Sequence, residues 1–366
     1  MTKCESYDLT EWGKPFEKAI REIPDLPDKA VLLKVTAAGL CHSDLHIKKG
    51  FMDLGERGKL TFTQRGAQLP LTLGHEIAGT VEATGASVTD VEPGQSVVVF
   101  PWIGCRTCLA CDEDRESDCS AMRIIGIHRN GGFATHVVVE DEKFLVDIDG
   151  LDPAIVAPYA CSGITVYNGL LKAGLTRPDE WLAILGAGGL GLNAIAIARA
   201  MGFENIIALD IDDAKLESAA QMGADKTLNS TGGEAVAETL KEATDNKLFA
   251  VLDTFGSEHT GALAVSALAK AGRYVVVGQH GGDFKMPQIW LPQKAMTVRG
   301  SHVGNSGHLR TVIDMYRQGK LKPIPVETRP LDQVNEAIAE LESGKVLGRI
   351  VFEPTKGVDE GDWMKK

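Results

Sequence analysis

The stretch WLAILGAGGLGLNAIAIARAMG, residues 181–202, decides how the second half of the chain folds. It begins with an apolar run typical of a buried strand, continues through a glycine-rich turn and ends in an apolar segment of helical character. Gly186, Gly188 and Gly191 give the turn the spacing G-x-G-x-x-G. A strand, a tight turn and a helix in this order form the phosphate-binding unit of dinucleotide-binding sheets. The stretch therefore predicts a doubly wound parallel sheet that binds a dinucleotide.

An acidic residue follows this turn at the spacing that a dinucleotide site requires. Asp210 ends the next apolar strand, IIALDID (206–212), roughly two dozen residues after the first glycine. A carboxylate there can accept hydrogen bonds from both ribose hydroxyls and repels a 2′-phosphate, which favours NAD over NADP. No Arg follows Asp210 directly, and we count the nearby Lys215 as a further cofactor-binding residue. A glycine turn that only packs a helix on a sheet would not by itself place an acid there.

Length and composition limit the classes of protein to consider. With 366 residues, 44% hydrophobic and 24% charged, the chain is an ordinary globular protein long enough for more than one core. Its 38 basic and 50 acidic side chains give a net charge of −12, which argues against binding to nucleic acid or an anionic membrane. No apolar run approaches 18 residues, and the N-terminus lacks an apolar signal segment. We expect a cytoplasmic protein.

The rest of the chain divides into a β-rich and an alternating part. The first half contains short strands between Gly and Pro residues: KAVLLKVTAAG (29–39), GHEIAGTVEATG (74–85), QSVVVFPW (95–102) and FATHVVVE (133–140). From about Pro153 apolar strands alternate with helical segments, which predicts βαβ units. The tail contains two helical segments and the strand GRIVFEP (348–354). We expect it to return to the first domain, giving a discontinuous catalytic domain, 1–160 and 301–366, around a cofactor domain, 161–300.

Seven cysteines form the most informative compositional feature. An odd, uneven set in a reducing compartment fits thiolate ligands better than disulfides. Four thiolates can close a tetrahedral shell around Zn²⁺, which leaves no open position for a substrate. An iron–sulfur cluster is the rival, but the last cysteine here lacks the proline that follows it in ferredoxin motifs. The spacing C-x2-C-x2-C-x7-C in GCRTCLACDEDRESDC (104–119) therefore predicts a structural zinc held by Cys105, Cys108, Cys111 and Cys119.

Three other segments contain side chains that can serve a catalytic metal. They are CHSDLH (41–46), which follows a predicted strand, Gly74-His75-Glu76, which opens another, and APYACSGITVYNGL (157–170), which contains Cys161. A catalytic zinc usually has three protein ligands and one open position. Each segment alone is unremarkable, because a buried cysteine more often packs than binds a metal.

These motifs together carry a family resemblance. CHSDLH, GHEIAGTVEATG, the four-cysteine segment and LGAGGLGL (185–192), in this order, resemble the zinc-dependent medium-chain alcohol dehydrogenases. The resemblance extends from about Lys14 to Pro354 and is closest in character to the bacterial and archaeal tetrameric members. It implies an α/β protein with a β-rich GroES-like catalytic domain plus a doubly wound parallel-sheet Rossmann domain. It also implies NAD, two zinc ions per chain, an active site between the domains, and a homotetramer or homodimer.

The resemblance also implies a role for individual residues. The catalytic zinc ligands match Cys41, His75 and Cys161, and Glu76 matches the adjacent acid. Asp44 matches the carboxylate that orients the ligand histidine. Ser43 and His46 match the relay that carries the alcohol proton to solvent, and His42 matches a basic residue near the cofactor pyrophosphate. The alcohol pocket matches Trp102, Ile124 and His302.

One of these positions departs from the family pattern. His302 stands where an aliphatic residue is more usual. Its imidazole either admits a polar or carboxylated substrate or makes a hydrogen bond at a subunit interface.

The predicted reaction is the reversible oxidation of primary or secondary alcohols to aldehydes or ketones, with hydride transfer to NAD. A zinc ion lowers the pKa of a bound alcohol and so favours its deprotonation near neutral pH. A polyol, sugar or hydroxy-acid dehydrogenase of the same superfamily is the alternative, although polyol and sugar enzymes commonly have a carboxylate where Cys161 stands. A non-catalytic redox protein that binds NAD and zinc is a further alternative, against which the intact set of ligands and relay residues argues.

Overall fold

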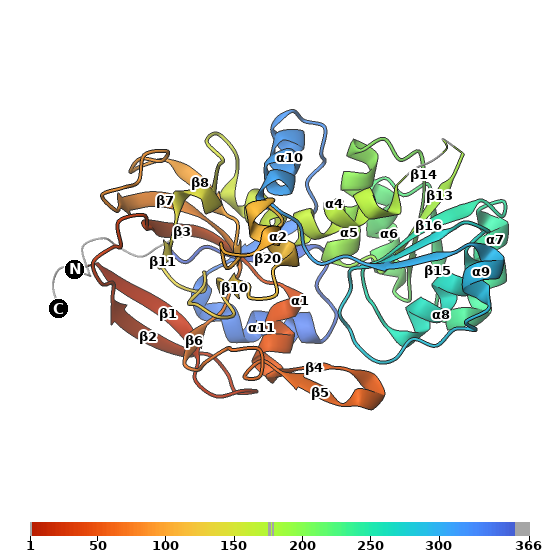
Figure 1. Ribbon diagram of the computed structural model, residues 1–366, viewed down its shortest axis with the longest axis horizontal. Coiled ribbons are helices and arrows are strands. Elements are labelled where there is room, and N and C mark those ends of the chain that lie inside the picture. The colour runs from red at the N-terminus through yellow and green to blue at the C-terminus, as the bar shows by residue number, and fades with distance from the viewer. Residues whose placement is uncertain (1, 175–176, 178, 356–366) are drawn as a thin grey trace.

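The computed structural model describes residues 2–174, 177 and 179–355, so residues 356–366 of the predicted catalytic domain lie outside the described residues. Figure 1 shows two regions side by side along the longest axis. A β-rich region contains the chain from residue 3 to residue 156 and takes up further segments near the C-terminus. The other region alternates strands with helices.

The alternating region is built on a six-stranded parallel sheet with the order β15-β14-β13-β16-β17-β18. Numbered along the chain, this order is 3-2-1-4-5-6, that of doubly wound dinucleotide-binding sheets. The strands are β13 (Trp181–Leu185), β14 (Asn205–Asp210), β15 (Lys226–Asn229), β16 (Leu248–Asp253), β17 (Arg273–Val276) and β18 (Thr297–Gly300). The order reverses between β13 and β16, and ligands bind such sheets beyond the carboxyl ends of the strands at that point.

Helices cover both faces of this sheet (Figure 1). They are α4 (Ser162–Ala173), α5 (Gly189–Ala200), α6 (Asp213–Met222), α7 (Ala237–Ala243), α8 (Glu258–Ala267) and α9 (Trp290–Lys294). Leu182 and Ile184 of β13 belong to the core cluster that includes α4 and α5, whereas Ala183 and Leu185 belong to the cluster that includes α8. Because alternate side chains of a strand point to opposite faces, a strand covered on both sides is apolar throughout, as WLAIL is.

The β-rich region centres on a seven-stranded sheet. Its order is β12-β8-β7-β3-β20-β19, with β11 also paired to β3. The strands are β3 (Val31–Gly39), β7 (Glu76–Thr84), β8 (Ser96–Val99), β11 (His136–Val139), β12 (Leu145–Asp147), β19 (Val326–Arg329) and β20 (Arg349–Phe352). Val351 pairs with Gly39, and Phe352 with Ala38. The last described strand of the chain therefore lies beside one of its first.

Smaller elements complete this region. A three-stranded sheet contains β1 (Lys3–Leu9), β2 (Glu17–Glu22) and β6 (Leu71–Thr72), and two pairs join β4 (Phe51–Asp53) to β5 (Lys59–Thr61) and β9 (Trp102–Ile103) to β10 (Arg123–Ile124). The α-helices are α1 (His42–Lys49), α2 (Leu109–Asp112), α3 (Pro153–Val156), α10 (Ser306–Arg317) and α11 (Val334–Glu342). The predicted strand 95–102 is divided into β8 and β9 at Pro101, which has no backbone N–H for a ladder.

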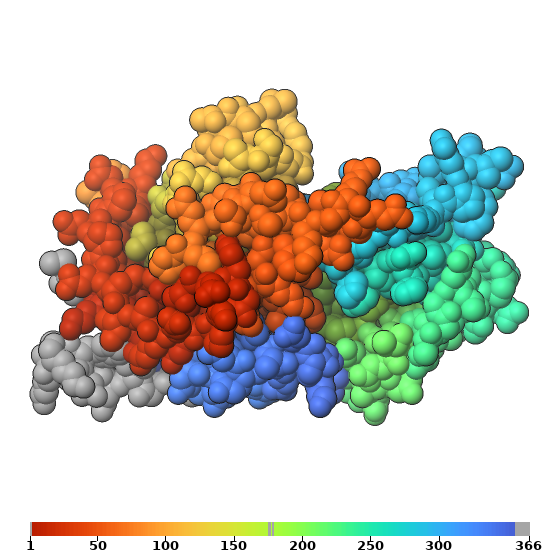
Figure 2. Space-filling model, turned by 90° about the horizontal axis from the view of Figure 1, so that it is seen from below, coloured from red at the N-terminus to blue at the C-terminus, as the bar shows by residue number. Residues whose placement is uncertain are grey.

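The hairpin formed by β4 and β5 contacts the alternating region. Backbone N–H of Glu56 donates to Oδ2 of Asp283 at 2.5 Å, and Lys285 Nζ lies 2.9 Å from Oε1 of Glu56. Figure 2 shows the orange hairpin reaching the cyan segment that contains these partners. This contact crosses between the two sheets.

Among the described residues, no single helix has the length and apolar character needed to cross a membrane. One bent pair, Pro153–Ala160 with Ser162–Ala173, meets that criterion by length and composition.

Candidate active site and metal centres

The first site element is the start of α1, where the sequence forms its own helix cap. Cys41 is the N-cap residue, with extended backbone angles of φ −108° and ψ 152°. Its N–H donates to Oδ2 of Asp44 at 2.9 Å, the reciprocal bond of a capping box. Gly50, at φ 86°, ends the helix. The helix therefore begins directly after Cys41, which fixes the place of that thiol.

Four side chains from distant parts of the chain meet at this point. The dispersed cluster consists of Cys41, His75 and Glu76 at the start of β7, and Cys161 at the start of α4; their ligand atoms lie within 4.8 Å of one another. All four are buried. The two sulfur atoms are 3.9 Å apart. This separation fits two thiolates on one tetrahedral zinc, for which a metal–sulfur distance of about 2.3 Å gives an edge of about 3.8 Å.

His75 has the orientation and the unmet bonding capacity of a metal ligand. Its side chain is fully buried, yet neither ring nitrogen has a hydrogen-bond partner among the described residues. Oδ1 of Asp44 lies 3.4 Å from Nδ1, which leaves Nε2 for a ligand. Burial lowers the pKa of His75, but the nearby negative charge of Asp44 outweighs it, and the net pKa is raised well above its usual value. The donor set of two thiols and one buried imidazole nitrogen fits zinc.

The two thiols of the dispersed cluster differ in proton affinity. The hydrogen bond between them lowers the pKa of Cys41 and raises that of Cys161, and burial raises both. His75 adds to the lowering at Cys41. A metal ion binds only the deprotonated thiols, so metal binding here releases protons.

Glu76 is buried beside a residue that local sequence did not identify. Burial favours the neutral form of Glu76 and raises its pKa, and the guanidinium of Arg349 opposes this increase. The two side chains form an ion pair, and Oε2 of Glu76 has no partner among the described residues. Arg349 belongs to β20, and no motif marked it. Only the pairing of β20 with β3 brings Arg349 to Glu76, and that pairing has no signal in the local sequence.

The predicted relay residues share one face of α1. Ser43 and His46 are three positions apart and half-buried. Among the described residues, no hydrogen bond joins them. Burial, followed by the charge of Lys49, lowers the pKa of His46, so this imidazole stays neutral to a lower pH than an exposed histidine.

The four-cysteine loop (residues 104–119) forms a second, separate group of ligand atoms. Sγ of Cys111 lies 4.0 Å from that of Cys105 and 3.6 Å from that of Cys108, and Cys119 Sγ accepts from the Cys105 N–H at 3.3 Å. All four sulfurs lie within 4.8 Å of one another, again close to a tetrahedral zinc shell. A Cβ at Gly104 would lie 2.4 Å from Sγ of Cys111, so only glycine leaves room for that thiol.

The glycine turn after β13 leaves an open position at the start of α5. A Cβ at Gly191 would lie 1.8 Å from the carbonyl oxygen of Gly186, whereas a Cβ at Gly188 would meet nothing within 4 Å. Gly188 is the N-cap and supplies no side-chain cap, so the first N–H groups of α5 are free for an anion. Asp210 braces the turn, because its Oδ2 accepts from the Ala187 N–H at 2.7 Å. The geometry fits a dinucleotide pyrophosphate.

Two basic residues predicted for the cofactor lie near each other. Partial burial lowers the pKa of His42. The charge of Cys41 raises this pKa, whereas the charges of Arg349, His46 and Lys215 lower it. Lys215 lies on α6 and His42 on α1, so the two charges come from different regions of the chain.

The three predicted pocket residues also come together. Trp102 and Ile124 are paired across β9 and β10 and are buried. The ring of His302 packs edge-on against Trp102, with centroids 5.8 Å apart. Trp102 also packs against His75, with centroids 5.6 Å apart.

Comparison with known families agrees with this arrangement. Residues 27–150 match the alcohol dehydrogenase GroES-like domain, and residues 189–318 match the zinc-binding dehydrogenase family. The predicted fold class, a GroES-like unit plus a doubly wound sheet, is confirmed.

Individual relatives are similar over nearly the whole chain. A NAD-dependent alcohol dehydrogenase of Sulfurisphaera tokodaii is 37% identical over 94% of this chain and 99% of its own, and one of Saccharolobus solfataricus is 36% identical over the same shares. The crystal structure of an alcohol dehydrogenase from Aeropyrum pernix has a TM-score of 0.87 at 30% identity, covering 96% of this chain and 100% of its own. The chain therefore belongs to the family of zinc-binding, medium-chain alcohol dehydrogenases.

Proposed function

We propose that this protein is a NAD-dependent alcohol dehydrogenase that interconverts primary or secondary alcohols with aldehydes or ketones. The observation that carries the proposal is the dispersed cluster, in which the buried His75, whose ring nitrogens have no hydrogen-bond partner among the described residues, lies together with two thiols. The family and the names of the relatives support the same activity.

The cofactors supply the reactive chemistry. When bound, zinc acts as a Lewis acid that lowers the pKa of an alcohol, and NAD accepts the hydride. In this proposal Cys41, His75 and Cys161 hold the metal, and Glu76, paired with Arg349, lies within reach of it. Asp44 keeps the proton on Nδ1 of His75, so that Nε2 faces the metal.

The proton leaves along α1. Ser43 lies nearer the dispersed cluster, and His46, one turn further on, passes the proton to solvent. Since burial keeps His46 neutral, its imidazole can accept a proton during alcohol oxidation at neutral pH.

NAD binding is assigned to the glycine turn and its surroundings. The free N–H groups at the start of α5 bind the pyrophosphate, with His42 and Lys215 adding positive charge. Asp210 accepts hydrogen bonds from the ribose hydroxyls. To do so, its carboxylate gives up part of the hydrogen bonding that it now makes with the backbone of the glycine turn. Replacing Asp210 with Ser should relax the preference for NAD, measured as kcat/KM with each cofactor. A native preference for NADP would contradict this assignment.

We further propose two zinc ions per chain, with the second in the four-cysteine loop. That shell is complete without a substrate, so its role is structural. The pocket is assigned to Trp102, Ile124 and His302. We also propose a catalytic domain of residues 1–160 and 301–366 and a cofactor domain of residues 161–300. We further propose a homotetramer or homodimer, which native mass measurement tests, and a cytoplasmic location.

Turnover with a panel of substrates tests the function. We expect NADH absorbance at 340 nm to rise with alcohols, and the rise to disappear after chelation of the metal and return with added zinc. Preference for polyols or sugars over simple alcohols would favour the sugar-dehydrogenase alternative. A similar structure supports that alternative: the D-arabinose dehydrogenase from Sulfolobus solfataricus, at 26% identity and a TM-score of 0.82. No turnover with any alcohol, polyol or aldehyde would refute the proposal.

A further inference from the structure

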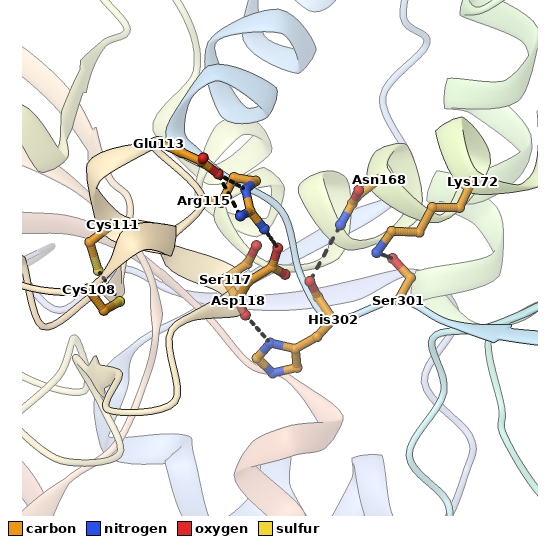
Figure 3. A network of polar contacts seen from close by, with 10 residues as sticks. All are labelled: Cys108, Cys111, Glu113, Arg115, Ser117, Asp118, Asn168, Lys172, Ser301 and His302. Carbon is orange, nitrogen blue, oxygen red and sulfur yellow. Dashed lines mark hydrogen bonds and ion pairs between the residues drawn. The ribbon is translucent and has the colours of Figure 1, made fainter.

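The segment that follows β18 crosses from the cofactor region to the four-cysteine loop (Figure 3). Nδ1 of His302 lies 3.4 Å from the carbonyl oxygen of Ser117. A carbonyl oxygen only accepts, so Nδ1 carries the proton and the tautomer of the ring is fixed. Ser117 lies two positions before Cys119, in a turn that Arg115 holds through ion pairs with Glu113 and Asp118. His302 therefore touches the loop next to one of its predicted ligands.

The other side of the His302 ring leads to the dispersed cluster. It meets Trp102 at an interplanar angle of 78°, and Trp102 meets His75 at 67°, both edge-to-face contacts. Nε1 of Trp102 donates to the carbonyl oxygen of Ala160 at 3.0 Å, one residue before Cys161. A continuous line of contacts thus runs from the four-cysteine loop through His302 and Trp102 to two predicted ligands of the other metal.

The backbone around His302 is held in an unfavourable conformation. Val303 has φ 34°, in the left-handed region that β-branched residues rarely adopt. Nδ2 of Asn168 donates to the carbonyl oxygen of Val303 at 2.6 Å and to that of His302 at 3.4 Å, and Lys172 Nζ donates to Ser301 Oγ at 2.9 Å. Both donors belong to α4, which starts directly after Cys161. The segment is therefore fixed from α4 as well as from the loop (Figure 3).

We propose that His302 is a positioning residue that couples the four-cysteine loop to the dispersed cluster, so that an ordered loop keeps Trp102, and through it His75 and the backbone before Cys161, in place. This inference rests on the proposed function in assuming that the loop binds zinc, and it adds a role for that zinc beyond folding. The residue acts through its two neighbours: its Nδ1–H holds Ser117, and its ring packs in an edge-to-face contact against Trp102.

Three substitutions separate these two contacts. His302→Leu removes both. His302→Asn keeps a donor at the position of Nδ1 but loses the ring, and His302→Phe keeps the ring but loses the donor. His308→Leu is the matched control, because His308 is also a partly buried histidine in the following helix, where it packs on Tyr167 at 5.3 Å.

The readouts include two that need no turnover. In the zinc-loaded proteins we expect amide exchange over residues 113–119 to become at least about fivefold faster in His302→Leu and His302→Phe and to stay near the native rate in His302→Asn. Release of the loop metal to a chromogenic chelator should follow the same order. In steady state, His302→Leu should raise the KM for alcohol several-fold.

Native exchange and metal-release rates in both His302→Leu and His302→Phe would overturn the proposal, as would equal acceleration in His308→Leu. If His302→Leu does not fold, the contrast between His302→Phe and His302→Asn still decides. If no alcohol is turned over, the proposed function fails, but exchange still tests His302. If the purified protein carries no metal in the loop, the proposal of a second zinc is wrong. Faster amide exchange in His302→Phe would then show only that the contact orders a metal-free loop. That result would overturn the proposed coupling to zinc.

Discussion

The two candidate metal centres of this chain are built in opposite ways. The four-cysteine loop takes all its ligands from one short segment, and two of its thiols, Cys105 and Cys108, are half-exposed. The dispersed cluster takes its ligands from three separate elements and is buried throughout. A local site needs little beyond its own loop, whereas a buried site of mixed ligands depends on how elements of both regions pack together. The difference predicts which changes abolish chemistry and which only loosen the fold.

The largest contrast is expected between one ligand of each centre. His75→Ala removes the imidazole that would hold the catalytic metal and should lower kcat/KM for alcohol oxidation by about 10⁴-fold, because Lewis-acid stabilisation contributes several kcal/mol. Cys119→Ser should retain most turnover but lower the melting temperature. Zinc analysis should show the loss of one ion in each variant. Comparable loss of activity in both would break the distinction between a catalytic and a structural site.

The second contrast concerns the acid next to each centre. Arg349→Met leaves Glu76 buried without its partner and should lower the free energy of unfolding by about 3 kcal/mol or more. Lys143→Met removes the half-exposed partner of the buried Glu116, 3.6 Å away, and should cost at most about 1 kcal/mol. Urea titration measures both.

The double variant Glu76→Gln, Arg349→Met serves as the control for the first of these. It should recover much of the lost stability, since no unpaired carboxylate is then buried. Equal costs for Arg349→Met and Lys143→Met would show that burial is not what separates the two ion pairs.

Thiol access sharpens the comparison further. After the metals are removed with a chelator, Cys105 and Cys108 should react with iodoacetamide roughly 10- to 100-fold faster than Cys41 and Cys161, which are 8% and 7% exposed. Peptide mass spectrometry over a time course gives each rate. Modification of Cys41 as early as Cys105 would contradict the buried character of the dispersed cluster.

The smallest effect is expected for proton transfer from the buried cluster to solvent. The four-cysteine loop has no counterpart to this route, because a structural site exchanges no proton with a substrate. Burial places the pKa of His46 below the usual value of about 6.5, so the acid limb of kcat/KM for alcohol oxidation should lie below that pH. Below its pKa the imidazole is charged and accepts no proton, so the rate falls as pH falls. His46→Gln should slow oxidation about tenfold and remove this limb. An unchanged pH profile in His46→Gln would exclude His46 from proton transfer.

The same contrast explains what the sequence could predict. The cysteine spacing in residues 104–119 and the glycine turn after β13 are local patterns, and both appear in the structure as geometries that fit their ligands. The doubly wound sheet followed from strands and helices of the right period. Cys41, His75 and Cys161, by contrast, were selected through the family resemblance, because no local pattern brings distant residues together.

Some features had no readable signal. Arg349 lies in a short apolar strand whose sequence says nothing of Glu76, and its role depends on the pairing of β20 with β3. The sheet of β1, β2 and β6 also went unpredicted, because β2 (EKAIRE) is largely polar and exposed. At His302 the family resemblance indicated a place in the pocket or a hydrogen bond at a subunit interface, and its contact with Ser117 of the same chain requires coordinates.

The pairing of the last described strand with one of the first also sets a timetable for synthesis. At about 5–20 residues per second, roughly 10–40 s pass between the emergence of Cys161 and that of Arg349. During this interval the βαβ units, whose contacts are local, can form, whereas the pairing of β3 with β20 must wait. Glu76 has no guanidinium beside it until then. The region that a ribosome begins first is thus the one that it completes last, and a chain truncated before β20 would retain the three predicted zinc ligands without the strand that supplies the partner of Glu76.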